Sequence, residues 1–268
     1  MKNYQDFLTI NYNKELIPGL FEMELEGEGA RFITAPGQFI NIKINDSLQP
    51  YLRRPMSILD YDDTHIKLIY RIRGEGTKIL SEKKPGEKLD VLIGLGNGFT
   101  DTDYNEVIVV GGGSGTPPMY GLAKRLIEKG VKVTAVLGFN GSYDVFYEEE
   151  FKKLCPTYIS TMDGTTGTKG TVIDAIKENN LTFDHYYACG PEPMLDALVK
   201  NFPDNGSLSF EARMGCGFGA CMGCSCKVKT KPYKRICVEG PVLSSDEVII
   251  NENTGNRRRR LYRLAYCH

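Results

Sequence analysis

The amino-acid sequence predicts an α+β protein of several domains: an N-terminal antiparallel β-barrel, a central α/β domain with a parallel sheet, and a C-terminal cysteine-rich segment. Three observations lead to this prediction. The first hundred residues hold short alternating segments, strand and helix patterns alternate from about residue 103, and five of the eight cysteines fall between Cys216 and Cys237. With 268 residues, the chain is long enough for two domains and an appendage. We place the divisions at 1–102, 103–206 and 207–250, and assign no role to the tail at 251–268.

Charge and composition exclude several classes of protein. Lysine and arginine together number 33 against 34 for aspartate and glutamate, so there is no basic excess of the kind that binds nucleic acid. The N-terminus lacks the apolar stretch of a signal peptide, and no window approaches the ~18 apolar residues of a membrane span. We therefore expect a cytoplasmic protein, in which clustered cysteines are better suited to binding metal than to a disulfide scaffold.

The first hundred residues show the two-residue period of strands. Ile40, Ile42 and Ile44 alternate with polar residues, and apolar side chains recur in the same way between Ile66 and Ile72. Proline–glycine pairs such as Pro18-Gly19 mark turns. Short strands without helical patterns favour a small antiparallel barrel.

From about residue 103 the pattern is that of an α/β domain. An unbroken apolar run, Val107–Val110, predicts a strand buried on both faces. Apolar residues then recur at helical spacing from Met119 to Ile127, and Gly130 follows where a helix should end. Further strands near 131–137 and 185–188 alternate with helices near 171–178 and from about Pro191, which predicts a parallel sheet.

The cysteine cluster has the spacing of an iron–sulfur site. Cys216, Cys221, Cys224 and Cys237 form a C-x4-C-x2-C-x12-C pattern, and its first part is the plant-type [2Fe–2S] spacing. Each iron needs two thiolates, and one tight loop can supply three of the four. A hairpin over Lys227–Ile236 would return the fourth.

Two other interpretations of the cluster remain open at this point. A structural zinc site usually pairs two short knuckles, whereas here three cysteines crowd into one loop and the fourth stands apart. Disulfides are the other alternative. Cys226 is a fifth thiol, which is either a substitute ligand or a small buried residue beside the cluster.

Two strings in the barrel suit a flavin nucleotide. Arg54 follows Arg53, and an arginine can hold a pyrophosphate with two hydrogen bonds, while Ser57 can reach the edge of a flavin ring. Gly76 and Thr77 close a turn after a strand and can present N–H groups to phosphate oxygens. A basic pair at the start of a strand is also typical of a solvated edge, so the string alone is weak.

Two glycine-containing turns join strand to helix in the α/β domain. The first carries Gly111, Gly112, Gly113 and Gly115, which let the backbone approach a phosphate at a helix N-terminus. The alternative is a tight turn without a ligand. The second turn is Cys189-Gly190-Pro191, in which Cys189 is either a buried core thiol or a residue that faces the nicotinamide.

Taken together, these strings resemble the ferredoxin-NADP⁺ reductase superfamily and, more closely, the electron transfer subunits of type B, NAD-dependent dihydroorotate dehydrogenases. The resemblance covers about residues 5 to 250, and the C-terminal position of the cysteine cluster is its most specific point. It implies FAD, a [2Fe–2S] cluster and NAD as cofactors. It places FAD near Arg54, Pro55, Met56, Ser57, Tyr70, Gly76 and Thr77, and NAD near Gly111, Gly112, Gly113, Gly115, Cys189, Gly190 and Pro191.

The resemblance also implies a partner and a direction of electron flow. The partner is an FMN-containing catalytic subunit that oxidises dihydroorotate for pyrimidine biosynthesis, in a heterotetramer with two copies of each subunit. Electrons run from FMN through the cluster and FAD to NAD⁺, so this chain itself carries no catalytic acid or base. Phe218 and Met222, in the loop Gly215–Gly223, are suited either to a contact patch for that partner or to packing over the cluster.

Alternative functions remain at this stage. One is the small subunit of an NADH-dependent ferredoxin:NADP⁺ oxidoreductase or sulfide dehydrogenase, whose members often have an acid in place of Cys216. Another is a non-catalytic, zinc-stabilised binding module. No basic cluster follows the predicted strand that ends at Asn140, which favours NAD over NADP.

Overall fold

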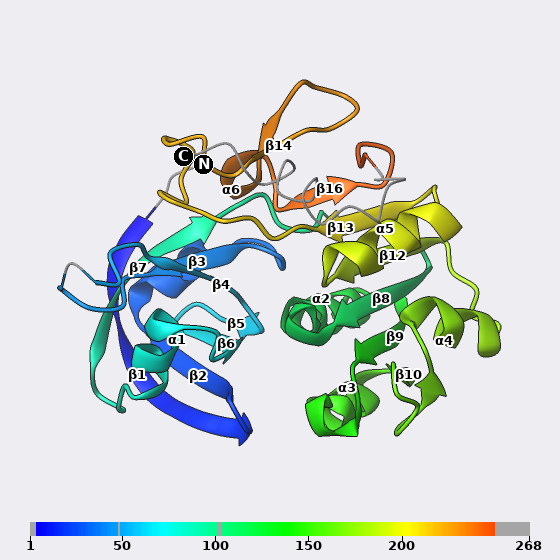
Figure 1. Cartoon of the computed structure of the whole chain (residues 1–268), viewed down its shortest axis with the longest axis horizontal. Coiled ribbons are helices and arrows are strands. Elements are labelled where there is room, and N and C mark those ends of the chain that lie inside the picture. The colour runs from blue at the N-terminus through cyan, green and yellow to red at the C-terminus, as the bar shows by residue number, and fades with distance from the viewer. Residues whose placement is uncertain (1–3, 48, 101–102, 250–268) are drawn as a thin grey trace.

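The computed structural model describes residues 4–47, 49–100 and 103–249 of the chain. Figure 1 shows two large sheets side by side, with the C-terminal segment lying across the top of both. The predicted order of barrel, α/β domain and cysteine-rich segment is confirmed. Within the described residues, no helix has both the length and the apolar character needed to cross a membrane.

The N-terminal sheet is antiparallel throughout, with seven strands in the order β4-β3-β7-β1-β2-β6-β5. Its apolar positions form a core of their own, in which Leu8, Ile40 and Leu68 are completely buried. The strands are β1 (Tyr4–Ile17), β2 (Leu20–Glu26), β3 (Phe39–Ile42), β4 (Arg54–Ser57), β5 (Asp60–Tyr61), β6 (His65–Arg71) and β7 (Lys88–Leu95), with a 3-10 turn at Glu28–Phe32.

A short helix, α1 (Glu75–Ser81), stands where the sequence predicted only a turn. Its buried residues are Gly76 and Leu80, so it has a single buried apolar side chain and shows no helical period. The helix therefore could not be recognised from apolar spacing.

The second sheet has the order β11-β10-β9-β8-β12-β13-β16, and every strand pair is parallel except β13 with β16. Chain order reverses between β8 and β12, which is the position where such sheets bind ligands at their carboxyl ends. The strands are β8 (Glu106–Gly112), β9 (Lys132–Phe139), β10 (Thr157–Thr161), β11 (Thr168–Lys169), β12 (His185–Cys189), β13 (Gly206–Ser209) and β16 (Val242–Ser244).

Helices cover both faces of this sheet. Val107 and Val109 of β8 face the core under α2 and α3, and Ile108 and Val110 face the core under α4 and α5. This explains why the β8 run is apolar without alternation. The helices are α2 (Thr116–Glu128), α3 (Glu148–Leu154), α4 (Val172–Glu178) and α5 (Glu192–Asn201), and 3-10 turns cover Gly113–Gly115 and Ser142–Asp144.

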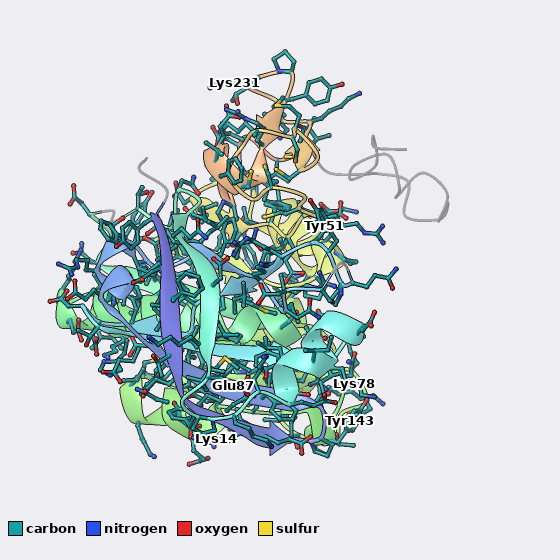
Figure 2. The ribbon with its side chains drawn as sticks, turned by 90° about the vertical axis from the view of Figure 1, so that its left-hand side faces the viewer. Lys14, Tyr51, Lys78, Glu87, Tyr143 and Lys231 are labelled. Atoms are coloured by element: carbon teal, nitrogen blue, oxygen red, sulfur yellow. The ribbon has the colours of Figure 1, made fainter. Side chains whose placement is uncertain are left out.

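The C-terminal segment shares its core with the α/β domain. The predicted hairpin is confirmed: β14 (Ser225–Cys226) pairs with β15 (Lys234–Arg235), and Figure 2 shows the tip at Lys231 projecting away from the sheets. The helix α6 (Ile236–Glu239) follows, and β16 then joins the edge of the second sheet. The division predicted at 206/207 thus falls inside β13, because the parallel sheet continues into the cysteine-rich segment.

Candidate cofactor site

The four predicted cluster ligands lie as two pairs of thiols. The sulfurs of Cys224 and Cys237 are 3.2 Å apart, because the β14–β15 hairpin returns the chain to the loop. The backbone N–H of Cys221 donates to the sulfur of Cys216 over 3.4 Å. The loop therefore presents the first ligand with the second and the third with the fourth.

Each pair is suited to binding a cation. The hydrogen bond with Cys237 lowers the pKa of Cys224 to about 6 and raises the pKa of Cys237 well above its ordinary value. Burial would raise the pKa of Cys216, but backbone N–H groups, first that of Cys221, outweigh it and lower this pKa to about 7. Each pair thus contains one thiol with a lowered pKa, and a bound metal ion would replace the proton of its partner, so a metal centre fits these residues.

The pairing suits a two-iron cluster better than a single zinc ion, because each iron takes two thiolates. Among the described residues, no group of three or more His, Cys, Asp or Glu side chains surrounds one point suitable for a single ion. The seven cysteines in the described part of the chain are all free thiols, which argues against the disulfide alternative.

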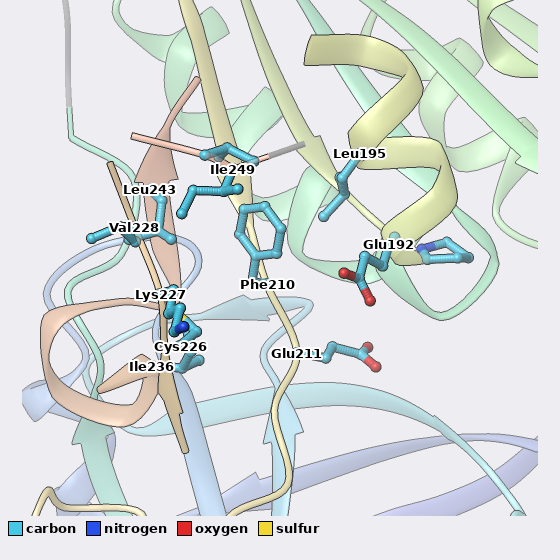
Figure 3. Close-up of a pocket in the computed structure, with 13 residues that line it drawn as sticks. Glu192, Leu195, Phe210, Glu211, Cys226, Lys227, Val228, Ile236, Leu243 and Ile249 are labelled. Carbon is cyan, nitrogen blue, oxygen red and sulfur yellow. The ribbon is translucent and has the colours of Figure 1, made fainter. Parts of the chain in front are cut away.

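Cys226 lies elsewhere, in the wall of an apolar pocket of about 210 Å³ between α5 and the C-terminal segment. Figure 3 shows this pocket, with Leu195 on one wall, Val228 on the other, and the carboxylates of Glu192 and Glu211 at its edge. The position of Cys226 agrees with its interpretation as a small residue near the cluster rather than a ligand.

Arg54 and Gly76, which were both predicted to lie near the FAD phosphates, are in direct contact. A Cβ atom on Gly76 would lie 2.5 Å from Nε of Arg54, so only glycine lets the guanidinium lie on α1. The neighbouring Arg53 is occupied by Asp90, with a 2.7 Å ion pair and a 2.8 Å hydrogen bond to the Asp90 carbonyl. Among the described residues, no carboxylate is within ion-pair distance of Arg54. Of the two adjacent arginines, Arg54 is therefore the one that can bind a phosphate.

Two other predicted flavin residues have structural roles. The Thr77 hydroxyl accepts from the backbone N–H of Arg73 over 2.8 Å and donates to the carbonyl of Gly74, which holds the start of α1. Tyr70 lies in the core of the N-terminal sheet, only 4% exposed, and donates to Asn13 over 2.8 Å.

A pocket of about 170 Å³ brings the two domains together. Pro55, Met56 and Ser57 line it from β4, and Cys189 lines it from β12. Cys189 is 2% exposed, and burial raises the pKa of its thiol to about 12. Cys189 is therefore a buried, neutral thiol, and it lines the same pocket as Ser57. Its facing the nicotinamide stays a prediction.

The two glycine-containing turns pack against each other. A Cβ on Gly115 would lie 2.1 Å from the Cys189 carbonyl oxygen, and one on Gly190 would lie 3.0 Å from Cα of Gly112. Gly111 is similarly close to Thr116, at 2.9 Å, and Gly112 is within 2.9 Å of the Pro191 ring. Gly112, Gly115 and Gly190 are thus needed for contact between the turns, and Gly111 for the close packing of the first turn on itself, whether or not a phosphate binds.

Gly113 is different, because it has φ +50 and open space beside it. It lines a pocket of about 480 Å³ at the carboxyl ends of β8, β9 and β10, together with Gly112, Ser114 and Phe139. This is the ligand position expected at the reversal of strand order. An ion pair of 3.0 Å between Arg71 and Asp144 lies in its wall.

The sequence did not single out Asn41 or Glu211. Asn41 alternates with isoleucines, and it is completely buried beneath the cysteine loop. Glu211 lines both the 170 Å³ and the 210 Å³ pockets. No local signal marks either residue, because their surroundings come from segments far away in the chain.

The antiparallel sheet carries an arginine beside a glycine, and no described carboxylate pairs with that arginine. Joined to a parallel sheet with a pocket at its strand reversal, this antiparallel sheet defines a ferredoxin-NADP⁺ reductase-like flavoprotein fold. Solved structures agree. The NADH-dependent reduced ferredoxin-NADP oxidoreductase matches with a TM-score of 0.83 and 25% identity over 96% of each chain. A ferredoxin NADP⁺ reductase from Neisseria gonorrhoeae matches with a TM-score of 0.63 and 16% identity, over 78% of this chain and 94% of that one.

Family models and curated relatives identify the family. Residues 211–249 match the iron-sulfur cluster binding domain of dihydroorotate dehydrogenase B, and residues 109–200 match the oxidoreductase NAD-binding domain. The dihydroorotate dehydrogenase B (NAD(+)) electron transfer subunit of a Geobacillus species is 47% identical, over 92% of this chain and 99% of the relative. That of Fusobacterium nucleatum is 46% identical, over 90% and 97%. The chain belongs to this family of electron transfer subunits.

Proposed function

We propose that this chain carries electrons from a dihydroorotate-oxidising, FMN-containing partner through a [2Fe–2S] cluster and FAD to NAD⁺, in pyrimidine biosynthesis. The observation that carries the proposal is the 170 Å³ pocket, where the Arg54–Ser57 strand meets Cys189 of the nucleotide-binding sheet. When bound there, FAD exchanges two electrons with a nicotinamide and single electrons with a cluster.

The chain's own residues bind, orient and exclude water. Arg54, packed on Gly76, binds the FAD pyrophosphate, and Pro55, Met56 and Ser57 line the ring site. NAD(H) enters the 480 Å³ pocket at Gly112 and Gly113. Cys216, Cys221, Cys224 and Cys237 hold the cluster.

The loop around the cluster forms the partner contact in this proposal. Phe218 and Met222 are 45% and 54% exposed, which is unusual for large apolar side chains next to a metal site. Covering them with a partner would also shield the cluster from water. The assembly would be a cytoplasmic heterotetramer with two copies of each subunit.

A second candidate is a ferredoxin-linked NADH oxidoreductase subunit, which the 0.83 TM-score supports. Identity to that structure is 25%, against 47% for a dihydroorotate dehydrogenase B subunit. Members of the ferredoxin-linked family often have an acid at the position of Cys216, so a thiol there also favours the first proposal.

Co-expression with the candidate FMN subunit is the direct test. The purified chain alone should contain FAD, iron and sulfide, show flavin absorption near ~450 nm, and oxidise NADH with an artificial acceptor. It should be inert toward dihydroorotate, whereas the complex should convert dihydroorotate to orotate with NAD⁺. Turnover of dihydroorotate by the chain alone, or binding of a ferredoxin in place of the FMN subunit, would contradict the proposal.

A further inference from the structure

Asn41 lies on the strand that joins the flavin pocket to the cysteine loop. In the β3–β4 ladder, Phe39 is opposite Ser57 and Asn41 is opposite Pro55. Phe39 and Ser57 line the 170 Å³ pocket. Since side chains two residues apart share a face, Asn41 extends that face by about 7 Å along the strand.

The carboxamide of Asn41 holds the first cysteine of the loop. Its Nδ2 donates to the backbone carbonyl of Cys216 over 3.3 Å. The next residue, Gly217, has φ +80, and a Cβ there would lie 2.5 Å from the same Nδ2. The backbone on either side of the Cys216–Gly217 bond is therefore fitted to this amide.

Stability alone does not account for an asparagine here. The side chain is 0% exposed, and its Oδ1 is buried without a hydrogen-bond partner among the described residues. Burial of a polar group costs free energy unless all of its hydrogen bonds are made. An apolar residue would be the cheaper choice in a strand whose neighbours, Ile40 and Ile42, are completely buried.

We propose that Asn41 is a positioning residue for electron exchange between the cluster and the flavin. By fixing the Cys216 carbonyl, it fixes the thiol of that residue relative to β4, and so the distance between the two cofactor sites. This inference rests on the proposed function. It goes beyond it by assigning the alignment of the two sites to one side chain that binds neither cofactor covalently.

Asn97 provides a matched control. It too fastens the C-terminal segment to the N-terminal sheet: its Nδ2 donates to the Val242 carbonyl over 2.9 Å, and its Oδ1 accepts from the Val242 N–H over 3.1 Å. It does not contact the cysteine loop in either hydrogen bond. Asn97→Leu therefore removes a comparable fastening without touching the ligand Cys216.

The test compares Asn41→Leu, Asn97→Leu and the unchanged full-length chain, each purified with its cofactors. We expect Asn41→Leu to retain iron, FAD and the rate at which NADH reduces the flavin. Its cluster should accept electrons from the flavin roughly tenfold more slowly, as followed by stopped-flow absorbance, and the EPR spectrum of the chemically reduced cluster should shift. Asn97→Leu should leave both the rate and the spectrum unchanged.

If Asn41→Leu does not fold, Asn41→Ala decides the question, because alanine removes the donor to the Cys216 carbonyl without adding bulk or charge. An unchanged rate and spectrum in the folded variant would overturn the inference, and so would equal effects of Asn97→Leu. These outcomes differ from failure of the proposed function, in which the unchanged chain would lack iron or flavin or would not react with NADH.

Discussion

The four predicted cluster ligands differ in their surroundings. Cys224 and Cys237 are 3% and 2% exposed, whereas Cys221 is at the surface. Changing any of the four to serine should remove or destabilise the cluster while FAD stays bound. The substitutions at Cys224 and Cys237 should also lower the melting temperature most, because these two side chains are buried. Cys226→Ser should keep full iron, because Cys226 lines the neighbouring pocket. Iron loss in Cys226→Ser together with full iron in Cys237→Ser would show that Cys226, and not Cys237, is the fourth ligand.

Arg53 and Arg54 are adjacent but should respond differently to substitution. Arg54→Ala removes a charge-assisted contact worth ~1.5–3 kcal/mol, so FAD should bind roughly 10- to 100-fold more weakly. Arg53→Ala breaks the Asp90 ion pair instead, so the folded chain should bind FAD nearly as before but melt at a lower temperature. Equilibrium dialysis of FAD and thermal melts separate the two. An unchanged affinity in Arg54→Ala would remove this residue from the site.

Local spacing made some of these residues predictable and others not. The cysteine pattern is contained in a short stretch, so four candidate ligands could be named from it, although not how they pair. The division of roles between Arg53 and Arg54 depends on Asp90, and the burial of Asn41 depends on a loop that begins at Cys216. Contacts between segments so far apart leave no periodic signal in either one.

The contact between the two strand-to-helix turns supplies an element-scale prediction. Gly115→Ala would place a methyl group 2.1 Å from the Cys189 carbonyl oxygen, which forces α2 away from β12. We expect a loss of stability of about 1–3 kcal/mol and weaker NADH binding, measured by urea unfolding and by titration. Gly74→Ala is the control, since its Cβ meets nothing within 4 Å and its φ of 179 suits any residue. Equal stability of the two variants would refute the packing role.

Elements with strong periodicity were predicted well, and short ones were not. The α2 pattern gave its position because eight of its residues are buried. The helix α1 and the strand β16 have too few buried side chains to show a period. The edge strand β16 is held in the sheet by pairing with β13, a tertiary contact that local sequence spacing does not reveal.

At the scale of the whole molecule, the candidate site is made by three parts of the chain that share surfaces. Helix α2 lies between the two sheets, where Lys124 pairs with Asp60 of β5 at 2.7 Å (Figure 1). The cysteine loop lies on β3, and β16 completes the nucleotide-binding sheet. The flavin pocket therefore forms only in the assembled fold. This explains why each motif could be identified from the sequence, whereas the pocket that the motifs form together could not.

Glu22 on β2 links the N-terminal sheet to the start of α3 in the α/β domain through a buried carboxylate. It accepts hydrogen bonds from Tyr147 at 2.5 Å and Tyr12 at 2.8 Å, and it pairs with Lys14 at 2.9 Å. Burial would raise the pKa of Glu22, but these contacts outweigh it and lower the pKa below the ordinary 4.5. Because the folded pKa is depressed, the stabilisation is complete above the unfolded-state value of 4.5 and is lost as the pH falls through the folded pKa.

Glu22→Gln should therefore be less stable than the unchanged chain at neutral pH, and the difference should shrink below pH 4.5, where the carboxyl begins to protonate in the unfolded chain. Melting temperatures measured by circular dichroism between neutral and acidic pH would show this convergence. Glu149→Gln is the control, because that side chain is 73% exposed and its ion pair with Lys152 should contribute little. Parallel pH profiles for Glu22→Gln and the unchanged chain would mean that the carboxylate does not stabilise the link between β2 and α3.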